Sequence, residues 1–187
     1  MEKSGFALLA LALFAFVLAA GCAGTSQPPP ESSQFTYDNV TVMIITANGN
    51  ISVHAQVAKS QEQQEFGLMY RESLAEGSGM IFPFAQAGNY GFYMKNMKIP
   101  LDIIYAKPVQ DSGNGNQQGT GNPANGMNGK SYQIIKITRN FQPCKSDPCP
   151  IDYSGGGADM VLEVPAGYAK AHGIKEGDVL LISGGTY

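Results

Sequence analysis

Residues 40–58 read VTVMIITANGNISVHAQVA, and this stretch predicts a β-hairpin. Two runs rich in β-branched side chains, Val40–Thr46 and Ile51–Ala58, flank the sequence Ala-Asn-Gly-Asn. Because asparagine and glycine tolerate the positive φ that tight turns require, the two runs can fold back on each other as strands. We therefore expect the ordered part of the chain to begin with an antiparallel pair.

The rest of the chain continues this pattern of short apolar runs separated by turn residues, which favours a small, mainly β domain. A capping-box sequence at Ser60–Gln63 predicts a short helix that ends near Phe66 and is closed by Gly67, and a second short helix is expected near Ala166–Ala171. The predicted fold is a single-domain β-barrel or β-sandwich with one or two short helices. The further strands that we expect are Met80–Phe84, Tyr90–Lys95, Leu101–Ala106, Tyr132–Asn140, Met160–Val164 and Val179–Ser183.

The 187 residues divide into three parts by composition. Residues 1–22 form a signal or lipoprotein leader or a membrane anchor, residues 23–38 form a flexible tether rich in proline and serine, and residues 39–187 form the β domain. Within the domain, residues 107–130 contain almost no large apolar side chain and many glycines and asparagines. Such a segment cannot bury enough surface to order itself, so we predict a long disordered loop between two strands.

The leader predicts export. An unbroken apolar run, Phe6–Ala20, follows Lys3 and ends in the small residues Gly21 and Cys22. This pattern is similar to a lipoprotein signal, in which the cysteine is lipidated, although Leu18 lies one residue further from Cys22 than is usual. A retained membrane helix or ordinary cleavage would place the domain on the same side. We predict a domain anchored to the outer face of the cell membrane, in an extracellular or periplasmic space.

The other two cysteines, Cys144 and Cys149, lie in the sequence FQPCKSDPCP. Outside the cytoplasm, such a closely spaced pair is most simply a disulfide that closes a small loop. The alternative is half of a metal site, which would need two further ligands, and the two histidines, His54 and His172, lie far away in the sequence. We predict the disulfide and no metal.

The formal net charge of −3 and the lack of a basic cluster in the sequence argue against nucleic acid as a partner. No serine lies in a nucleophile elbow, and no glycine-rich loop precedes a helix as phosphate binding would require. The sequence therefore gives no reason to expect a cofactor.

Several short motifs follow one another in the domain. They are Gly67-Leu68-Met69-Tyr70-Arg71, Gly79-Met80-Ile81-Phe82-Pro83-Phe84, the stretch Phe92–Ile103, Leu162-Glu163-Val164-Pro165-Ala166-Gly167, and His172-Gly173-Ile174 with Gly177-Asp178. As a set, these motifs resemble the DUF192 family, also called an uncharacterised ancient conserved region, over about residues 50–183. The resemblance implies a compact, mainly β domain with little helix, and it implies no activity, because none is established for the family.

One polar residue stands out because it interrupts an apolar strand. Asp102 lies within Ile99-Pro100-Leu101-Asp102-Ile103-Ile104-Tyr105, where an ionised carboxylate is costly unless it is paired. The structural interpretation is a partly buried ion pair with Arg71 or Lys95 that fixes the strand register. The functional interpretation is a polar cleft of Arg71, Lys95, Asn96 and Asp102, which would hold an anionic or sugar-like ligand or carry out acid/base chemistry.

The methionines allow a second functional hypothesis. Met94 and Met97, together with His54, could bind copper(I) through soft ligands. We favour core packing instead, because methionine fills irregular gaps and the neighbouring residues are apolar. His172 is expected at the C-terminus of the second helix, where a histidine interacts well with the helix dipole.

The sequence is compatible with three functions. The favoured one is a non-catalytic module that binds a small ligand or an envelope protein at the cell surface. The second is an envelope enzyme in which Asp102 acts as acid or base and Arg71 or Lys95 stabilises negative charge. The third is a structural or assembly factor without a small-molecule site.

Lipidation can be checked directly by mass spectrometry of the mature N-terminus. We expect the mature chain to begin at Cys22 and to carry a lipid on that cysteine. An unmodified Cys22 would instead leave a signal anchor or a soluble secreted form.

Overall fold

A computed structural model describes residues 34–109 and 129–183. The leader, the tether up to residue 33, and residues 110–128 lie outside the described residues, so the predictions made for them stay predictions. Among the residues that are described, no helix is both long enough and apolar enough to cross a membrane.

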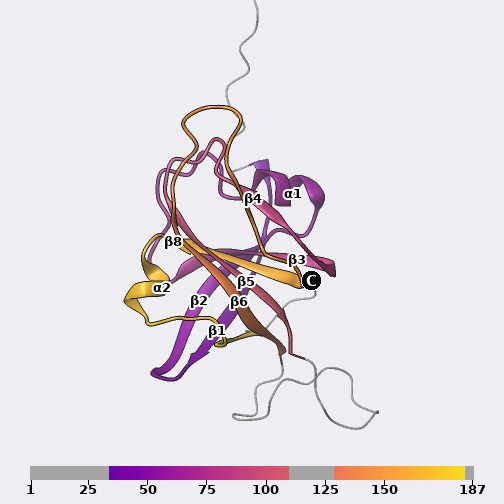
Figure 1. The fold of residues 1–187 in the computed structure, drawn as a ribbon, viewed down its shortest axis with the longest axis vertical. Coiled ribbons are helices and arrows are strands. Elements are labelled where there is room, and N and C mark those ends of the chain that lie inside the picture. The colour runs from indigo at the N-terminus through magenta and orange to yellow at the C-terminus, as the bar shows by residue number, and fades with distance from the viewer. Residues whose placement is uncertain (1–33, 110–128, 184–187) are drawn as a thin grey trace, which may run out of the picture.

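Strands dominate the domain, as expected, and seven of them close into a barrel in the order β1-β2-β3-β8-β5-β6-β9 (Figure 1). Neighbouring barrel strands are antiparallel except β2 and β3, which are parallel. A separate two-stranded sheet pairs β4 with β7. The elements are β1 (Asp38–Thr46), β2 (Gly49–Val57), α1 (Gln61–Phe66), β3 (Ser78–Gly88), β4 (Gly91–Tyr93), β5 (Leu101–Pro108), β6 (Lys130–Phe141), β7 (Ile151–Tyr153), β8 (Ala158–Pro165), α2 (Tyr168–Ala171) and β9 (Val179–Ser183).

The predicted hairpin is confirmed and its turn is tight. β1 pairs with β2 from Asp38 opposite Val57 to Thr46 opposite Gly49, so only two residues connect the strands. Gly49 has a φ of 129°, which an L side chain rarely adopts. The glycine therefore lets the second strand begin directly after the turn.

The main core fills the inside of the barrel, because alternate side chains of each strand point inward. On β8, for example, Met160, Leu162 and Val164 are fully buried in this core. The short helix α2 adds Tyr168 and Ala169 to the same core. The barrel is therefore packed with side chains rather than hollow.

Asp102 holds α2 in place. Its carboxylate accepts backbone hydrogen bonds from Asn140 (2.7 Å), Gly167 (3.0 Å) and Ala169 (2.9 Å). Gly167, the residue before α2, provides no capping side chain of its own. Asp102 on β5 therefore supplies the cap from a distant part of the chain, which satisfies buried N–H groups at the start of the helix.

A second core lies on the outer face of three adjacent strands, β3, β8 and β5. Phe82 of β3, Val161 of β8 and Ile103 of β5 are buried there, as are Leu68 and Met94 from the segments that cover them. The cover consists of α1, the connection after it, and the β4–β7 sheet, and Figure 1 shows α1 beside β4. Strands with apolar residues on both faces need such a second layer.

Two expectations about elements were wrong. The strand β7 was not expected, because Ile151–Tyr153 is only three residues long and follows a proline-rich loop. The expected loop at 107–130 begins too early and ends too late, because Lys107 and Pro108 belong to β5 and Lys130 begins β6. Both short helices and the remaining strands occur as expected, with shifted ends.

Replacing Asp102 with alanine should destabilise the fold strongly. Three backbone N–H groups, those of Asn140, Gly167 and the buried Ala169, would lose their acceptor, so we expect the free energy of unfolding to fall by about 3 kcal/mol. Denaturant unfolding measures the change. The matched control is Asp38→Ala, which removes an exposed ion pair with Lys59 and should change stability by only about 0.5 kcal/mol. Equal losses in the two variants would contradict the capping role.

Candidate functional site

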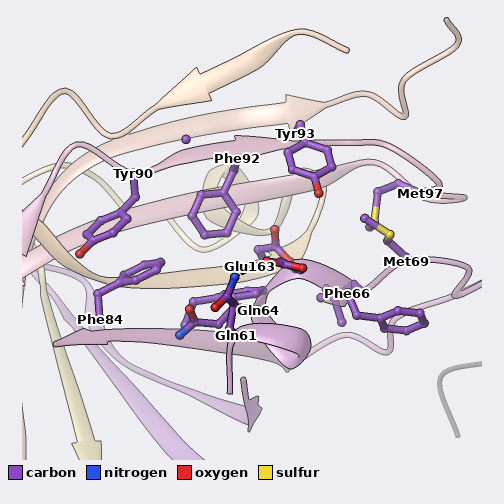
Figure 2. Close-up of a pocket in the computed structure, with 15 residues that line it drawn as sticks. Gln61, Gln64, Phe66, Met69, Phe84, Tyr90, Phe92, Tyr93, Met97 and Glu163 are labelled. Carbon is purple, nitrogen blue, oxygen red and sulfur yellow. Dashed lines mark hydrogen bonds between the residues drawn. The ribbon is translucent and has the colours of Figure 1, made fainter. Parts of the chain in front are cut away.

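A pocket opens in the second core, between α1, β4 and the outer faces of β3 and β8 (Figure 2). Its volume is about 290 Å³. This volume lies near the lower end of the range for small-molecule sites, so a ligand of this pocket would be small.

Six of the fifteen lining residues carry an aromatic ring. Phe84 and Tyr90 stack in parallel, with ring centroids 3.6 Å apart, and Phe92 meets Phe82 edge to face at 5.1 Å. Figure 2 shows Met69, Met97 and Phe66 at the opposite end of the pocket from the stacked pair. The pocket therefore presents ring faces and thioethers, which are apolar and polarisable surfaces.

The wall formed by β4 is fixed by β7 and by one partly buried network around an ion pair. Asp152 of β7 accepts hydrogen bonds from Lys136 (2.7 Å), Tyr105 (2.9 Å) and Thr138. Burial by itself would raise the pKa of Asp152, but these donors outweigh burial and hold the pKa below its usual value. The small sheet is therefore joined to β5 and β6 of the barrel.

The predicted disulfide between Cys144 and Cys149 is confirmed. It lies in the loop between β6 and β7, and the backbone N–H of Cys144 donates to the carbonyl of Met94 at 2.9 Å. The cross-linked loop is thus attached to the segment that follows β4. We conclude that the disulfide supports the covering layer, not the barrel itself.

The opposite wall is formed by α1. The predicted capping box is present: Ser60 accepts from the backbone of Gln63, and the Gln63 side chain accepts from the backbone of Ser60. Gln64 donates to the carbonyls of Ala58 and Pro83, at 3.2 and 2.9 Å. These bonds tie the helix to the end of β2 and to the middle of β3, so both walls of the pocket are held by the barrel.

The carboxyl group of Glu163 lies deep in the pocket, below Phe92 in Figure 2. Only 6% of the residue is exposed, and within the described residues its side chain has no hydrogen-bond partner. Burial raises the pKa of Glu163 to about 8, and the positive charge of Arg71 opposes this rise. A buried acid in a cleft with such a shifted pKa is a strong candidate for a functional residue.

A glycine in the second motif brings β3 close to this acid. A Cβ atom at Gly79 would lie 2.5 Å from the backbone oxygen of Glu163. Any larger residue would push the two strands apart, because backbone atoms cannot move aside as flexible side chains do. The glycine of the GMIFPF motif therefore sets the distance between β3 and the strand that carries Glu163.

The four residues predicted to form one cleft are placed differently. Asp102 is fully buried and bound by backbone N–H groups, and the expected ion pair with Arg71 or Lys95 is wrong. Lys95 is exposed and pairs with Asp147 at 3.2 Å. Asn96 is exposed and donates to the sulfur of Met69 at 3.7 Å, so it lies beside the pocket. None of the four is among the residues that line the described pocket.

Among these four residues, Arg71 is the one whose charge acts on a residue of the pocket lining, Glu163. Its guanidinium donates to Gln56, and its charge interacts with Tyr37 and Glu163. Burial lowers the pKa of Arg71, and these two neighbours oppose the change. Arg71 therefore affects the pocket through its electric field and not as part of the lining.

The structure places the methionines and histidines that were considered as copper ligands or as a helix cap. Met94 is buried in the second core, with Met80 beside it and Met97 packed against that core, as core packing predicts. His54 lies exposed on β2. His172 is the C-cap of α2, as expected, and its ring centroid lies 4.2 Å from that of Tyr168.

Glu163 is the functional candidate that the sequence interpretation missed. The signal was present, because Glu163 interrupts the apolar run of β8 just as Asp102 interrupts that of β5. Both are buried carboxylates, yet one is satisfied by backbone N–H groups and the other is not. Sequence alone does not distinguish them, since the partners come from residues far away in the chain.

Comparison with known proteins identifies relatives without a known activity. The sequence profile of the uncharacterised ancient conserved region DUF192 matches residues 43–111 and 129–182. No curated protein matches the chain. A crystal structure of a proposed transcription regulator from Sinorhizobium meliloti 1021 is similar, with a TM-score of 0.62 and 29% identity over 78% of this chain and 95% of that one. A protein of unknown function from Novosphingobium aromaticivorans gives a TM-score of 0.60 and 27% identity over 76% and 84% of the two chains.

The raised pKa of Glu163 predicts how stability changes with pH. The folded chain holds this proton up to about pH 8, whereas the unfolded chain releases it near 4.5. Folding is therefore weakened as the pH rises between these values, by on the order of 5 kcal/mol at most. Glu163→Gln removes this contribution, so we expect the variant to be more stable than the wild type at about pH 9, with a smaller difference at about pH 4.

Denaturant unfolding of both proteins across this range measures the effect, and the difference between them cancels the other titrating groups. Glu65→Gln on α1 is the control, because Glu65 is an exposed glutamate at the same pocket. A pH-independent difference between the wild type and Glu163→Gln would show that the carboxyl of Glu163 is not perturbed.

Proposed function

We propose that this chain, which belongs to the DUF192 family of uncharacterised proteins, is a non-catalytic binding module that holds a small ligand in its aromatic pocket. In this proposal the leader exports the domain and anchors it to the outer face of the cell membrane, and the tether separates the domain from the membrane surface.

The observation that carries the proposal is a preformed pocket of about 290 Å³ with aromatic walls and one buried, unpaired carboxyl group. Covering layers normally fill such space, because a protein interior is close-packed. An unfilled aromatic site with a convergent polar group is the typical form of a small-molecule site. A purely structural factor would have no need for either feature.

The geometry favours binding over the catalysis considered for Asp102. Both oxygens of the Asp102 carboxylate accept backbone hydrogen bonds, and none of that residue is exposed. A substrate therefore cannot reach it, whereas a general acid or base must come within hydrogen-bond distance of the reacting group. Lys95, the other proposed participant, forms an exposed ion pair with Asp147.

The residues that line the pocket suit some of the expected ligand classes better than others. Ring faces can stack on the apolar face of a sugar-like ligand, so this class suits the pocket. An anionic ligand suits it less, because Glu163 and Glu65 line the pocket and Arg71 does not. An envelope protein would have to insert a single side chain, since the cavity is small.

The description of the relative from Sinorhizobium meliloti as a transcription regulator is not part of this proposal. The present chain has a net charge of −3 and a sequence that predicts export. Binding to nucleic acid depends mainly on positive charge that neutralises phosphates. Neither property suits a protein that acts on DNA.

A thermal-shift screen with a panel of sugars, anions, amines and small aromatic compounds tests the proposal. We expect at least one class to raise the melting temperature of the wild type. Tyr93→Ala should weaken that ligand about tenfold, because it removes one ring from the wall. Tyr93 is 42% exposed, so its loss should leave the fold intact.

Tyr153→Ala is the matched control. Tyr153 lies on the neighbouring strand β7, is 49% exposed and does not line the pocket. It should bind the ligand as the wild type does. If no class of compound shifts the melting temperature, or if the two tyrosine variants bind equally, the proposed function is wrong.

A further inference from the structure

The charged side chains that line the pocket are all acidic. Among the fifteen lining residues, all within the described part of the chain, there is no lysine, arginine or histidine. Two carboxyl groups are present: Glu163 at depth and Glu65 at the rim on α1. Once Glu163 is ionised, the lining therefore favours a positive charge over a negative one, and the charge of Arg71 outside the lining opposes this preference only in part.

The aromatic walls point in the same direction. The face of an aromatic ring carries partial negative charge, so a cation near the face of Phe92, Tyr93 or Tyr90 is attracted to it. This attraction grows when the cation is removed from water, as it would be in a cavity enclosed by rings. A metal ion would lack ligands here, because groups of metal-binding side chains are absent among the described residues. An organic cation would need only the rings and one counter-charge.

The unpaired acid provides that counter-charge. A buried carboxylate without a partner is costly, and a positive charge at contact distance removes much of the cost. Arg71 does not fill this role, since the ion pairs among the described residues do not include a contact between Arg71 and Glu163. Among the described residues, the pocket thus contains an acid without an ion-pair contact, which a bound cation would provide.

We infer that the pocket binds a small organic ammonium cation, with aromatic rings around its alkyl groups and the carboxylate of Glu163 facing its charge. The inference rests on the proposed binding function and names the ligand class for that same pocket. Binding requires the ionised carboxylate, so the proton that Glu163 carries in the empty pocket leaves to solvent as the cation enters.

Three probes of nearly the same shape separate charge from shape. Choline carries a positive charge, dimethylbutanol replaces its nitrogen with carbon and is neutral, and dimethylbutanoate is negative. We expect choline to bind to the full chain at least about tenfold more tightly than dimethylbutanol, and dimethylbutanoate to bind weakest. Isothermal titration calorimetry measures all three affinities.

Two variants test whether the preference for choline over dimethylbutanol depends on the carboxyl group of Glu163. Glu163→Gln keeps the shape of the side chain and should remove the preference for choline over dimethylbutanol. Glu72→Gln makes the same chemical change at an exposed glutamate that does not line the pocket, and it should change choline affinity by no more than about twofold. Equal losses in the two variants would overturn the role given to Glu163.

The pH dependence gives a readout that a merely structural role would not affect. Choline keeps its charge at every pH, so its affinity should weaken by about fivefold from about pH 8 to about pH 7, as the proton competes for Glu163. Glu163→Gln should remove this dependence. The other titratable groups near Glu163 remain in the variant, and they are Arg71, Tyr105 on β5, Tyr90 just before β4, Tyr93 on β4, and Glu65 on α1.

The source of the cation can be determined in the same titration. Because trimethylammonium groups also occur on lipid headgroups, phosphatidylcholine vesicles are added to the protein with bound choline. Displacement of choline by the vesicles assigns the site to a lipid headgroup, and retention of choline assigns it to a free solute. Both results are consistent with an ammonium site.

The outcomes distinguish a failure of the ammonium inference from a failure of the proposed binding function. If dimethylbutanol binds as tightly as choline, or if a sugar from the screening panel binds and choline does not, the ammonium inference is wrong while the binding function stands. If neither these probes nor any compound of the panel binds, both proposals fail.

Discussion

Three adjacent strands of the barrel carry apolar side chains on both of their faces, and the rest of the architecture follows from this constraint. The inner faces of β3, β8 and β5 pack into the barrel, while Phe82, Val161 and Ile103 face outward. An exposed apolar sheet face of this size would be unfavourable in water. The chain therefore covers it with α1 and the β4–β7 sheet, and the pocket lies within that covering layer.

The two buried acids of the domain show how differently the same residue type can be used. Asp102 is surrounded by backbone N–H donors and acts as part of the scaffold, because it caps a helix that closes the main core. Glu163 is also buried, but among the described residues it has no hydrogen-bond partner and only the charge of Arg71 opposes the effect of burial, which raises its pKa. A satisfied acid stabilises the fold, whereas an unsatisfied one reduces its stability. An unsatisfied acid that opens into a pocket indicates a binding role.

Much of the fold could be predicted from local sequence. The hairpin at 40–58, the capping box at Ser60 and the barrel strands depend on short-range turn chemistry and on apolar patterns, which the sequence displays directly. The strand β7 could not be predicted, since Ile151–Tyr153 is a strand only because β4 and Asp152 hold it in place. Its order comes from long-range contacts and not from its own propensity.

For the site, the sequence settled the residue types and the tertiary structure settled their partners. The sequence identified carboxylates within apolar strands, the cysteine pair and the set of motifs that mark the family. It did not reveal that Asp102 meets backbone donors from residues 140, 167 and 169, nor that Lys95 lies apart from the pocket. Glycine at position 79 sets the spacing of β3 and β8 at Glu163. Burial and hydrogen bonding are properties of contacts between distant segments, so only the folded chain decided which acid is satisfied and which one faces a pocket.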